Sequence, residues 1–268
     1  MRDNAVSVVI GYMILLVITV SFIALLNAIW IPQMKQQAEV EHLRQVENSF
    51  LALATDIDRL TIYRQNASIT HRIQLGGGDV LFSPVRSSGS LQIRTIHSND
   101  DYLEISGNHL NITGLNLMFV PVNNFWVNQG YIWENGTIFV SKPDKKTPLE
   151  IWDNSASFLT NNLCPKVEQV SGNLTNVTIS IVTQDENQEA QIGGSGIGTV
   201  YCHTNCTIEQ SDNVDTMSFS GIATGWNQNL LQELKLSGVK YTSISNSIDF
   251  DPPVNITLKK CLLHLQLG

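Results

Sequence analysis

The first 31 residues contain one long apolar run. No charged side chain occurs from Asn4 to Ile31, a stretch of about 28 residues, and a helix needs only about 20 residues to cross a bilayer core. A secretory signal peptide has a shorter apolar core of about 7–15 residues that ends in a small-residue cleavage site. The pattern therefore predicts a transmembrane anchor over residues 1–31, with Trp30 at the membrane–water boundary. The alternative is a buried helix of a soluble core.

A second helical pattern follows Pro32. Apolar residues recur there at alternating spacings of three and four, namely Leu43, Val46, Phe50, Leu53, Ile57 and Leu60. This period predicts an amphipathic helix over residues 32–62. We expect its apolar stripe to pack on the chain's own β-domain, and a coiled coil of under three heptads is the alternative. Pro32 either starts this helix or kinks a continuous rod, because proline lacks the N–H of a helix interior.

Short β-type runs separated by turn residues occupy the rest of the chain, residues 63–268. The predicted strands are 69–75, 90–97, 102–106, 116–122, 131–134, 137–141, 176–183, 199–203, 217–222, 241–248 and 255–267. Asn135-Gly136 supplies the positive φ angles of a two-residue hairpin turn between two of them. One helix is expected near Trp226–Leu236. The fold class is therefore mainly β, with two N-terminal helices before a β-sandwich-like extracellular domain.

Charge and sequence motifs indicate which side of the membrane this domain occupies. The net charge is -8, so we expect no nucleic-acid partner, because phosphate binding needs a basic surface. The charges that flank the apolar run nearly balance and barely decide orientation. Asn-x-Ser/Thr acceptors for N-glycosylation lie beyond the run, at Asn66, Asn111, Asn135, Asn173, Asn176, Asn205 and Asn255. They favour a single-pass cell-membrane glycoprotein with its C-terminal domain outside.

The four cysteines support the same orientation, because all lie in the distal half of the chain and disulfides form outside the cell. They are Cys164, Cys202, Cys206 and Cys261. We expect two disulfides, with three connectivities open, and free thiols are an alternative. A metal site is a further alternative, in which Cys202-His203-x-x-Cys206 is completed by Cys164, Cys261 or His264.

Catalytic motifs are weak along the whole chain. The Gly-rich stretches 193–198 and 76–79 lack the residues of a phosphate-binding or dinucleotide-binding loop, and we interpret both as a hairpin turn or a flexible loop. The histidines occur singly, and acidic residues such as Asp212, Asp215, Asp249 and Asp251 lie in expected turns. We therefore predict no catalytic residue, no metal ligand and no cofactor, and expect a protein that is not an enzyme.

The N-terminus also resembles a known family. Arg2-Asp3-Asn4-Ala5-Val6-Ser7-Val8-Val9-Ile10-Gly11, followed by the apolar run, resembles the start of archaeal type IV pilin-like proteins. Within that family the chain looks like pilin-like surface proteins of methanogenic archaea, over roughly the first 95 residues. The residues that carry this likeness are Trp30-x-Pro32, Glu41-His42, Gly76-Gly77-Gly78, Ser83-Pro84 and Ser88-Gly89.

The resemblance implies cleavage by a prepilin peptidase between Ala5 and Val6. Asn4 stands where the family prefers a basic residue, and Val8 replaces the usual proline. The implied function is a non-enzymatic archaeal surface protein with a structural or adhesive role. Its expected partners are the lipid bilayer and other pilin-like subunits or cell-envelope components. The alternatives are a minor subunit of a pilus-like filament and a membrane-anchored extracellular hydrolase or ligand-binding receptor.

Overall fold

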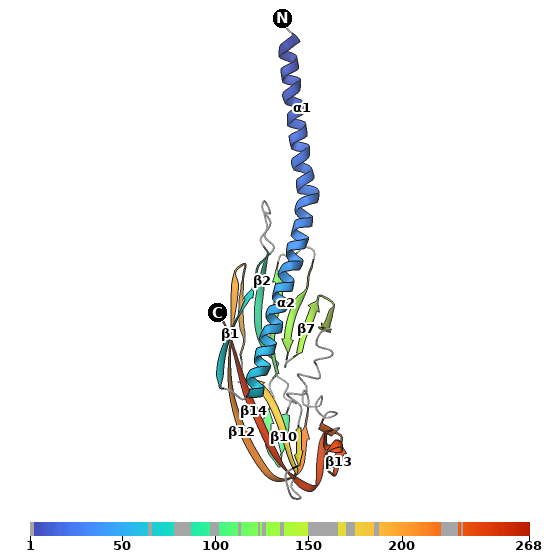
Figure 1. Cartoon of the computed structure of the whole chain (residues 1–268), viewed down its shortest axis with the longest axis vertical. Coiled ribbons are helices and arrows are strands. Elements are labelled where there is room, and N and C mark those ends of the chain that lie inside the picture. Colours follow the sequence, from blue (N-terminus) through green and yellow to red (C-terminus); the bar gives the residue numbers. More distant parts are fainter. Residues whose placement is uncertain are drawn as a thin grey trace.

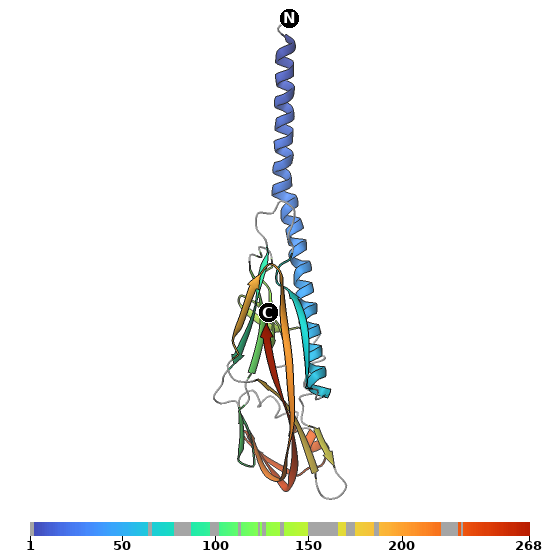
Figure 2. The same ribbon diagram turned by 90° about the vertical axis from the view of Figure 1, so that its left-hand side faces the viewer.

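The protein combines a long N-terminal helix with two β-sheets, as seen in a computed structural model of the chain (Figures 1 and 2). The structure describes residues 3–63, 66–77, 87–96, 102–111, 114–122, 124, 127–134, 137–149, 166–169, 175–184, 188–220, 230–231 and 233–268. This arrangement confirms the predicted fold class.

The N-terminal helix continues through Pro32 without a break. It comprises α1 (Asp3–Leu25), a π-helical turn η1 (Leu26–Trp30) and α2 (Ile31–Tyr63). In the π turn the N–H of Ile31 bonds to the carbonyl of Leu26, five residues earlier. Proline cannot donate the next hydrogen bond of the ladder, and a wide turn beside it is a common way to relieve the mismatch. Pro32 therefore lies in the first turn of α2 within one rod.

The first sheet has eight strands, in the order β4-β3-β12-β14-β10-β9, while β1 pairs with β12 and β13 pairs with β14. All its pairs are antiparallel except β10 with β14. The strands are β1 (Ala67–Gln74), β3 (Tyr102–Ile105), β4 (Asn108–Asn111), β9 (Lys166–Gln169), β10 (Thr175–Gln184), β12 (Ile197–Phe219), β13 (Tyr241–Ile244) and β14 (Ser247–Leu267).

The second sheet is antiparallel throughout, in the order β11-β2-β5-β6-β7-β8. Its strands are β2 (Ser88–Ile96), β5 (Gly114–Val122), β6 (Gly130–Glu134), β7 (Thr137–Lys142), β8 (Lys145–Pro148) and β11 (Ala190–Gly194). Glu134 pairs with Thr137, which confirms a two-residue connection at positions 135–136. Those two residues themselves lie outside the described part of the chain.

Several strand predictions differ from the structure in their extent. Run 199–203 and residues 217–219 of run 217–222 belong to one long strand, β12, because the polar segment between them pairs with β14 instead of turning. Residues 221 and 222 of the second run lie outside the described part of the chain. Run 241–248 is wrong as one strand: Ser245, with φ 54°, reverses the chain between β13 and β14. Strands β4, β8, β9 and β11 were not predicted, since each is short and polar. Helix occurs at residues 230–231 and 233–236, within the expected segment, while Trp226 is not described.

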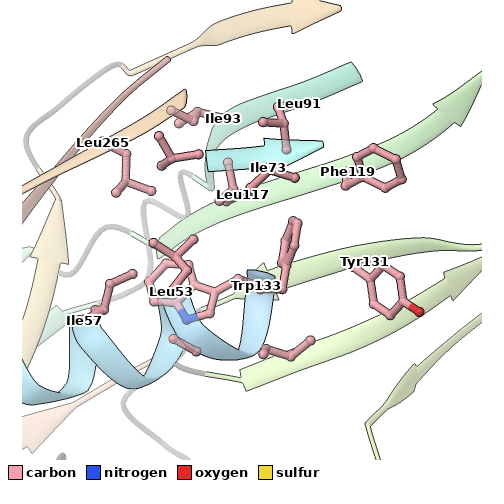
Figure 3. Close-up of a cluster of buried hydrophobic side chains, with 14 of the residues drawn as sticks. Leu53, Ile57, Ile73, Leu91, Ile93, Leu117, Phe119, Tyr131, Trp133 and Leu265 are labelled. Atoms are coloured by element: carbon pink, nitrogen blue, oxygen red, sulfur yellow. The ribbon is translucent and has the colours of Figure 1, made fainter. Parts of the chain in front are cut away.

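The stripe of α2 is buried in a core that both sheets share, which we call the proximal core. All six stripe residues, Leu43 to Leu60, are at most 7% exposed. They pack with residues such as Ile73 and Leu265 from the first sheet and Leu117 and Trp133 from the second (Figure 3). Helix α2 contacts β1 and β12 on one side and β6 and β7 on the other. The predicted packing on the chain's own β-domain is confirmed, and the coiled-coil alternative is wrong.

A second, distal core lies toward the other end of the long β12–β14 ribbon. In β14 it buries even-numbered residues such as Ile256 and Leu258, whereas the proximal core buries odd-numbered Leu263 and Leu265, and Cys261 is buried on that same odd-numbered face. Successive side chains of a strand point to opposite faces. The pairing register runs without interruption from Ser211–Ile256 to Val200–Leu267. The two cores therefore lie on opposite faces of one ribbon, and the ribbon changes its buried face between Leu258 and Cys261.

Candidate functional site

Helix α1 is apolar on every side and exposed along its described length. The exposed fraction is 65% for Leu15, 63% for Leu16 and 61% for Val17, consecutive residues that point in different directions around the helix. An 18-residue stretch of this helix is strongly apolar, and none of it is buried in the protein. Its length and composition suit a membrane span, and they also admit a signal sequence. Figures 1 and 2 show it projecting well beyond the β-domain.

Two polar side chains of the apolar half bond to their own helix. Thr19 Oγ1 donates to the carbonyl of Leu15 at 2.8 Å, and Asn27 Nδ2 donates to the carbonyl of Ile23 at 2.9 Å. In a hydrocarbon environment an unsatisfied polar group is costly. These two bonds satisfy a donor on each side chain without any neighbouring helix.

Polar contacts hold the first half of α2 on the β-domain, and the sequence patterns did not reveal them. Glu39 is 4% exposed and accepts a hydrogen bond from the N–H of Val127 at 3.3 Å. His42 is 2% exposed, and its Nε2 lies 2.9 Å from the carbonyl oxygen of Gln74. The spacing of Glu39 and His42 was the sequence signal for this burial, because the two residues extend the apolar stripe of α2 by one turn.

Tyr131 makes a further polar contact with α2. Its hydroxyl donates to Glu47 Oε2 at 2.8 Å and accepts from Gln129 Nε2 at 2.9 Å. Burial raises the pKa of Tyr131, and the neighbouring Glu47 carboxylate raises it further. Because the phenol stays neutral, it remains a hydrogen-bond donor to the helix. These contacts place α2 in one orientation on the second sheet.

The two Gly-rich segments meet at the end of the domain beside His42. Leu75 N–H donates to the carbonyl of Gly196 at 2.8 Å. A Cβ atom on Gly76 would lie 2.6 Å from Ser195 Cα, so only glycine permits this approach. The turn after Gly194 joins β11 of one sheet to β12 of the other. The hairpin interpretation of stretch 193–198 is therefore wrong, since its flanking strands do not pair with each other.

The cysteines form one disulfide in the described part of the chain. Cys206 and Cys261 lie directly opposite each other on β12 and β14, with Cα atoms 4.0 Å apart, and are bonded. Cys202 is a free thiol, 1% exposed in the proximal core. Its cross-strand neighbour is Leu265, so no thiol faces it there. The expectation that all four cysteines pair is thus wrong at Cys202, while Cys164 lies outside the described residues.

The metal alternative built on Cys202-His203-x-x-Cys206 is not assembled. Cys202 points into the core while His203 is exposed on the opposite face of β12. Cys206 is committed to its disulfide with Cys261. Within the described ranges no group of three or more His, Cys, Asp or Glu side chains is placed to hold a metal ion.

The predicted glycosylation acceptors occupy different environments. Asn66, Asn111 and Asn205 are exposed, whereas Asn176 and Asn255 are half-buried and stand in register on β10 and β14. Asn66 Oδ1 accepts from the N–H of Cys206 at 2.9 Å, and Asn255 Oδ1 accepts from the N–H of Asn213 at 3.1 Å. Asn135 and Asn173 are not described. Ala5 and Val6, the implied cleavage positions, lie within α1.

The titratable groups near Cys202 do not activate its thiol. His71 Nε2 lies 3.0 Å from Asp56 Oδ2, on the side of α2 that faces β1. Burial raises the pKa of Cys202 to about 12, with a further contribution from the Asp56 carboxylate. A thiol in this state is a poor nucleophile. The acidic residues Asp212 and Asp215 lie within β12 and Asp249 and Asp251 within β14, not in the expected turns.

A comparison with protein families gives one match. Residues 4–108 are similar to a model described as a family of unknown function (DUF7289). This is less than half of the 268-residue chain, and it covers the helix, β1, β2 and β3. No curated protein matches the chain, and no solved structure matches it. The matched segment largely coincides with the part of the sequence that resembles pilin-like proteins.

Proposed function

We propose that this protein is a pilin-like, single-pass, membrane-anchored protein of an archaeal cell surface, with a structural or adhesive role and no catalysis. The observation that carries the proposal is the contrast within one helix. Its first part, α1, is apolar all round and covered by no other part of the described chain, whereas the stripe of α2 is buried in the protein's own core.

The length of the apolar run fits a bilayer. About 28 residues at ~1.5 Å per residue give about 42 Å, against a hydrocarbon core of about 30 Å. A helix satisfies its own backbone hydrogen bonds, so a single span is stable without partner helices. The bonds of Thr19 and Asn27 to their own helix also fit an isolated span.

An external position of the β-domain agrees with two features. Cys206 and Cys261 form a disulfide, which persists in oxidising compartments. Three acceptor asparagines, at positions 66, 111 and 205, are exposed to solvent. Lipid is therefore the partner that we propose for α1, and other envelope components for the outer domain.

Protease shaving of intact cells tests the topology. Added protease should remove the β-domain and leave α1 in the membrane, whereas a cytoplasmic marker protein should stay intact until the cells are lysed. Full protection of the domain in intact cells would contradict the proposal.

A minor subunit of a pilus-like filament is the second candidate, and one observation favours it. The helix continues through Pro32 as one rod, the form needed to line the inside of a filament. Shearing the cells separates the two candidates. A stand-alone anchor stays with the membrane, whereas a filament subunit is released with detached filaments and begins at Val6.

A membrane-anchored hydrolase or ligand-binding receptor is the remaining alternative. An open pocket between β2 and β11 is lined by Gln92, Arg94, Glu189 and Gln191 among others. Its two charged residues, Arg94 and Glu189, are both exposed to solvent. Catalytic acids and bases are usually tuned by burial in a cleft, so we give this pocket no role.

A further inference from the structure

A row of polar side chains crosses the outer face of the first sheet, opposite the proximal core. Ser68 on β1 pairs with His203 on β12, and His203 pairs with His264 on β14. Both histidines are exposed. Gln188, which lies just before β11, contacts the ring of His264. None of these residues belongs to the anchor or to the core.

The two imidazoles stand close enough to share one ligand. Cys206 and Cys261, a pair with Cα atoms 4.0 Å apart, are of the closely spaced, non-hydrogen-bonded type. Pair types alternate along the ladder, so the His203–His264 pair, three positions away, is of the hydrogen-bonded type. Cα atoms in such pairs are about 5.5 Å apart and their side chains lie on the same face. Two ring nitrogens can then approach a common ion at about 2.0–2.1 Å each.

We propose that His203 and His264 form a site for a divalent late transition-metal ion such as Zn²⁺, Ni²⁺ or Cu²⁺. Neutral imidazole nitrogen is a ligand that these ions favour. The chain supplies two ligands, and water fills the other coordination positions. This site differs from the Cys-containing arrangement considered from the sequence, because it uses only the residues on the outer face of the ribbon.

The surroundings of His203 suit a metal ligand. Ser68 Oγ lies 2.9 Å from His203 Nδ1. A serine hydroxyl can accept a hydrogen bond from Nδ1–H, which leaves the lone pair of Nε2 free for the ion. A hydrogen bond on the second ring nitrogen is the usual way in which proteins orient a ligating histidine.

The side chain of Gln188 disfavours binding of a metal ion by His264. Its Oε1 accepts from the N–H of Leu265 at 3.1 Å, so its Nε2 faces His264 Nδ1 as a donor. That contact favours the tautomer in which Nε2 carries the proton, and a metal ion cannot bind there. Gln188 must therefore turn away when the ion binds, and its side chain weakens the site.

Titration of the full-length, detergent-solubilised protein with ZnCl₂ by calorimetry tests this site. The protein is prepared without glycans, because Asn205 lies two residues from His203 on the same face. We expect one zinc ion per chain. Losing a hydrogen-bond partner of a ligand costs about 10–100-fold in affinity, so His203→Gln and His264→Gln should each weaken binding by at least about tenfold. His109→Gln, which removes an exposed histidine of β4, should change nothing.

Replacing Gln188 gives a second, independent test. In Gln188→Glu one carboxylate oxygen still accepts a hydrogen bond from the Leu265 N–H, while the other accepts a hydrogen bond from His264 Nδ1–H. The metal-binding tautomer is then favoured, and we expect zinc to bind about tenfold more tightly. Gln191→Glu adds the same charge on β11 and should have little effect. Unchanged binding in both histidine variants, or in Gln188→Glu, would overturn the proposal.

Discussion

The two halves of the N-terminal helix have the same backbone form but opposite relations to the rest of the molecule. In α1, Leu15 and Phe22 are 65% and 61% exposed, whereas in α2 Phe50 and Leu53 are both 0% exposed. Apolar content alone does not explain the difference, because the all-apolar half is the exposed one. What differs is the pattern: α2 has one apolar stripe and a polar remainder, while α1 has no polar face.

This contrast shows that the two halves suit different surroundings. A helix that is apolar all round is buried in a large core or in a membrane, and no described part of this chain covers α1. Helix α2 instead forms the side of the proximal core between the two sheets (Figure 3). The π turn and Pro32 mark the boundary between the two environments.

Shortening a phenylalanine in each half should give the largest contrast. Phe50→Ala leaves a cavity beside Tyr131, whose ring centroid lies 6.1 Å away. We expect it to lower the free energy of unfolding of the β-domain by about 3–5 kcal/mol. The matched variant Phe22→Ala should leave that free energy unchanged. Urea unfolding of the full-length protein in detergent, followed by tryptophan fluorescence, measures both. Equal effects of the two variants would contradict the conclusion that α2, and not α1, packs into the core of the β-domain.

A lysine placed in each half tests the same division in the membrane. Leu16→Lys should make insertion less favourable by about 3 kcal/mol, because a charged side chain near the centre of a span is costly. Val40→Lys, at a position of α2 that is 37% exposed, should be tolerated. The measurement is the fraction of protein that stays in alkali-washed membranes. Full retention of Leu16→Lys would argue that α1 is not the anchor.

The buried thiol beside α2 predicts a dependence of stability on pH. Because the pKa of Cys202 is raised to about 12 from its ordinary value of 9.0, the folded state keeps a proton that the unfolded state releases between those pH values. The free energy of unfolding therefore falls as pH rises above about 9. In Cys202→Ala the free energy of unfolding should fall less steeply between pH 8 and 10.5, because the buried thiol is absent. Tyr131, whose pKa is also raised, contributes equally to both proteins, so an identical slope would disprove the assignment.

The smallest effect is expected for a polar residue within α1. Thr19→Val removes a hydroxyl that bonds only to the carbonyl of Leu15 in the same helix. Interhelical hydrogen bonds in membranes contribute about 0.6 kcal/mol on average, and an intrahelical bond should matter less for association. We expect no change in membrane retention or in crosslinking between copies. Loss of a crosslinked species in Thr19→Val would show that this face of α1 contacts another helix, as in a filament.

Local sequence patterns predicted most of the helices and strands, but not where each one begins and ends. The spacing of Leu43 to Leu60 predicted both α2 and its buried face, and Asn135-Gly136 predicted the pairing of β6 with β7. The middle of β12 was missed because its residues are exposed and polar, and only pairing with β14 keeps it extended. A strand of this kind has no apolar alternation to reveal it.

The candidate sites depended even more on long-range pairing. Nothing in the spacing of Cys202, Cys206 and Cys261 tells which two are bonded, since the choice follows from the register of β12 on β14. The same register places His203 opposite His264. The burial of Glu39 and His42 was not predicted, because polar residues on a helix normally face solvent and only the fold buries these two.

Local sequence patterns are sufficient to specify the helix with its two contrasting halves and the mainly β character of the rest of the chain. Both are local properties, since they depend on hydrophobic periodicity and turn residues within a few positions. Three other features follow from the tertiary fold: two cores lie on opposite faces of one ribbon, Cys202 stays free, and the Gly-rich segments meet. These features depend on which strands pair and in which register. That choice is made by packing among residues far apart in the chain, which a local pattern does not record.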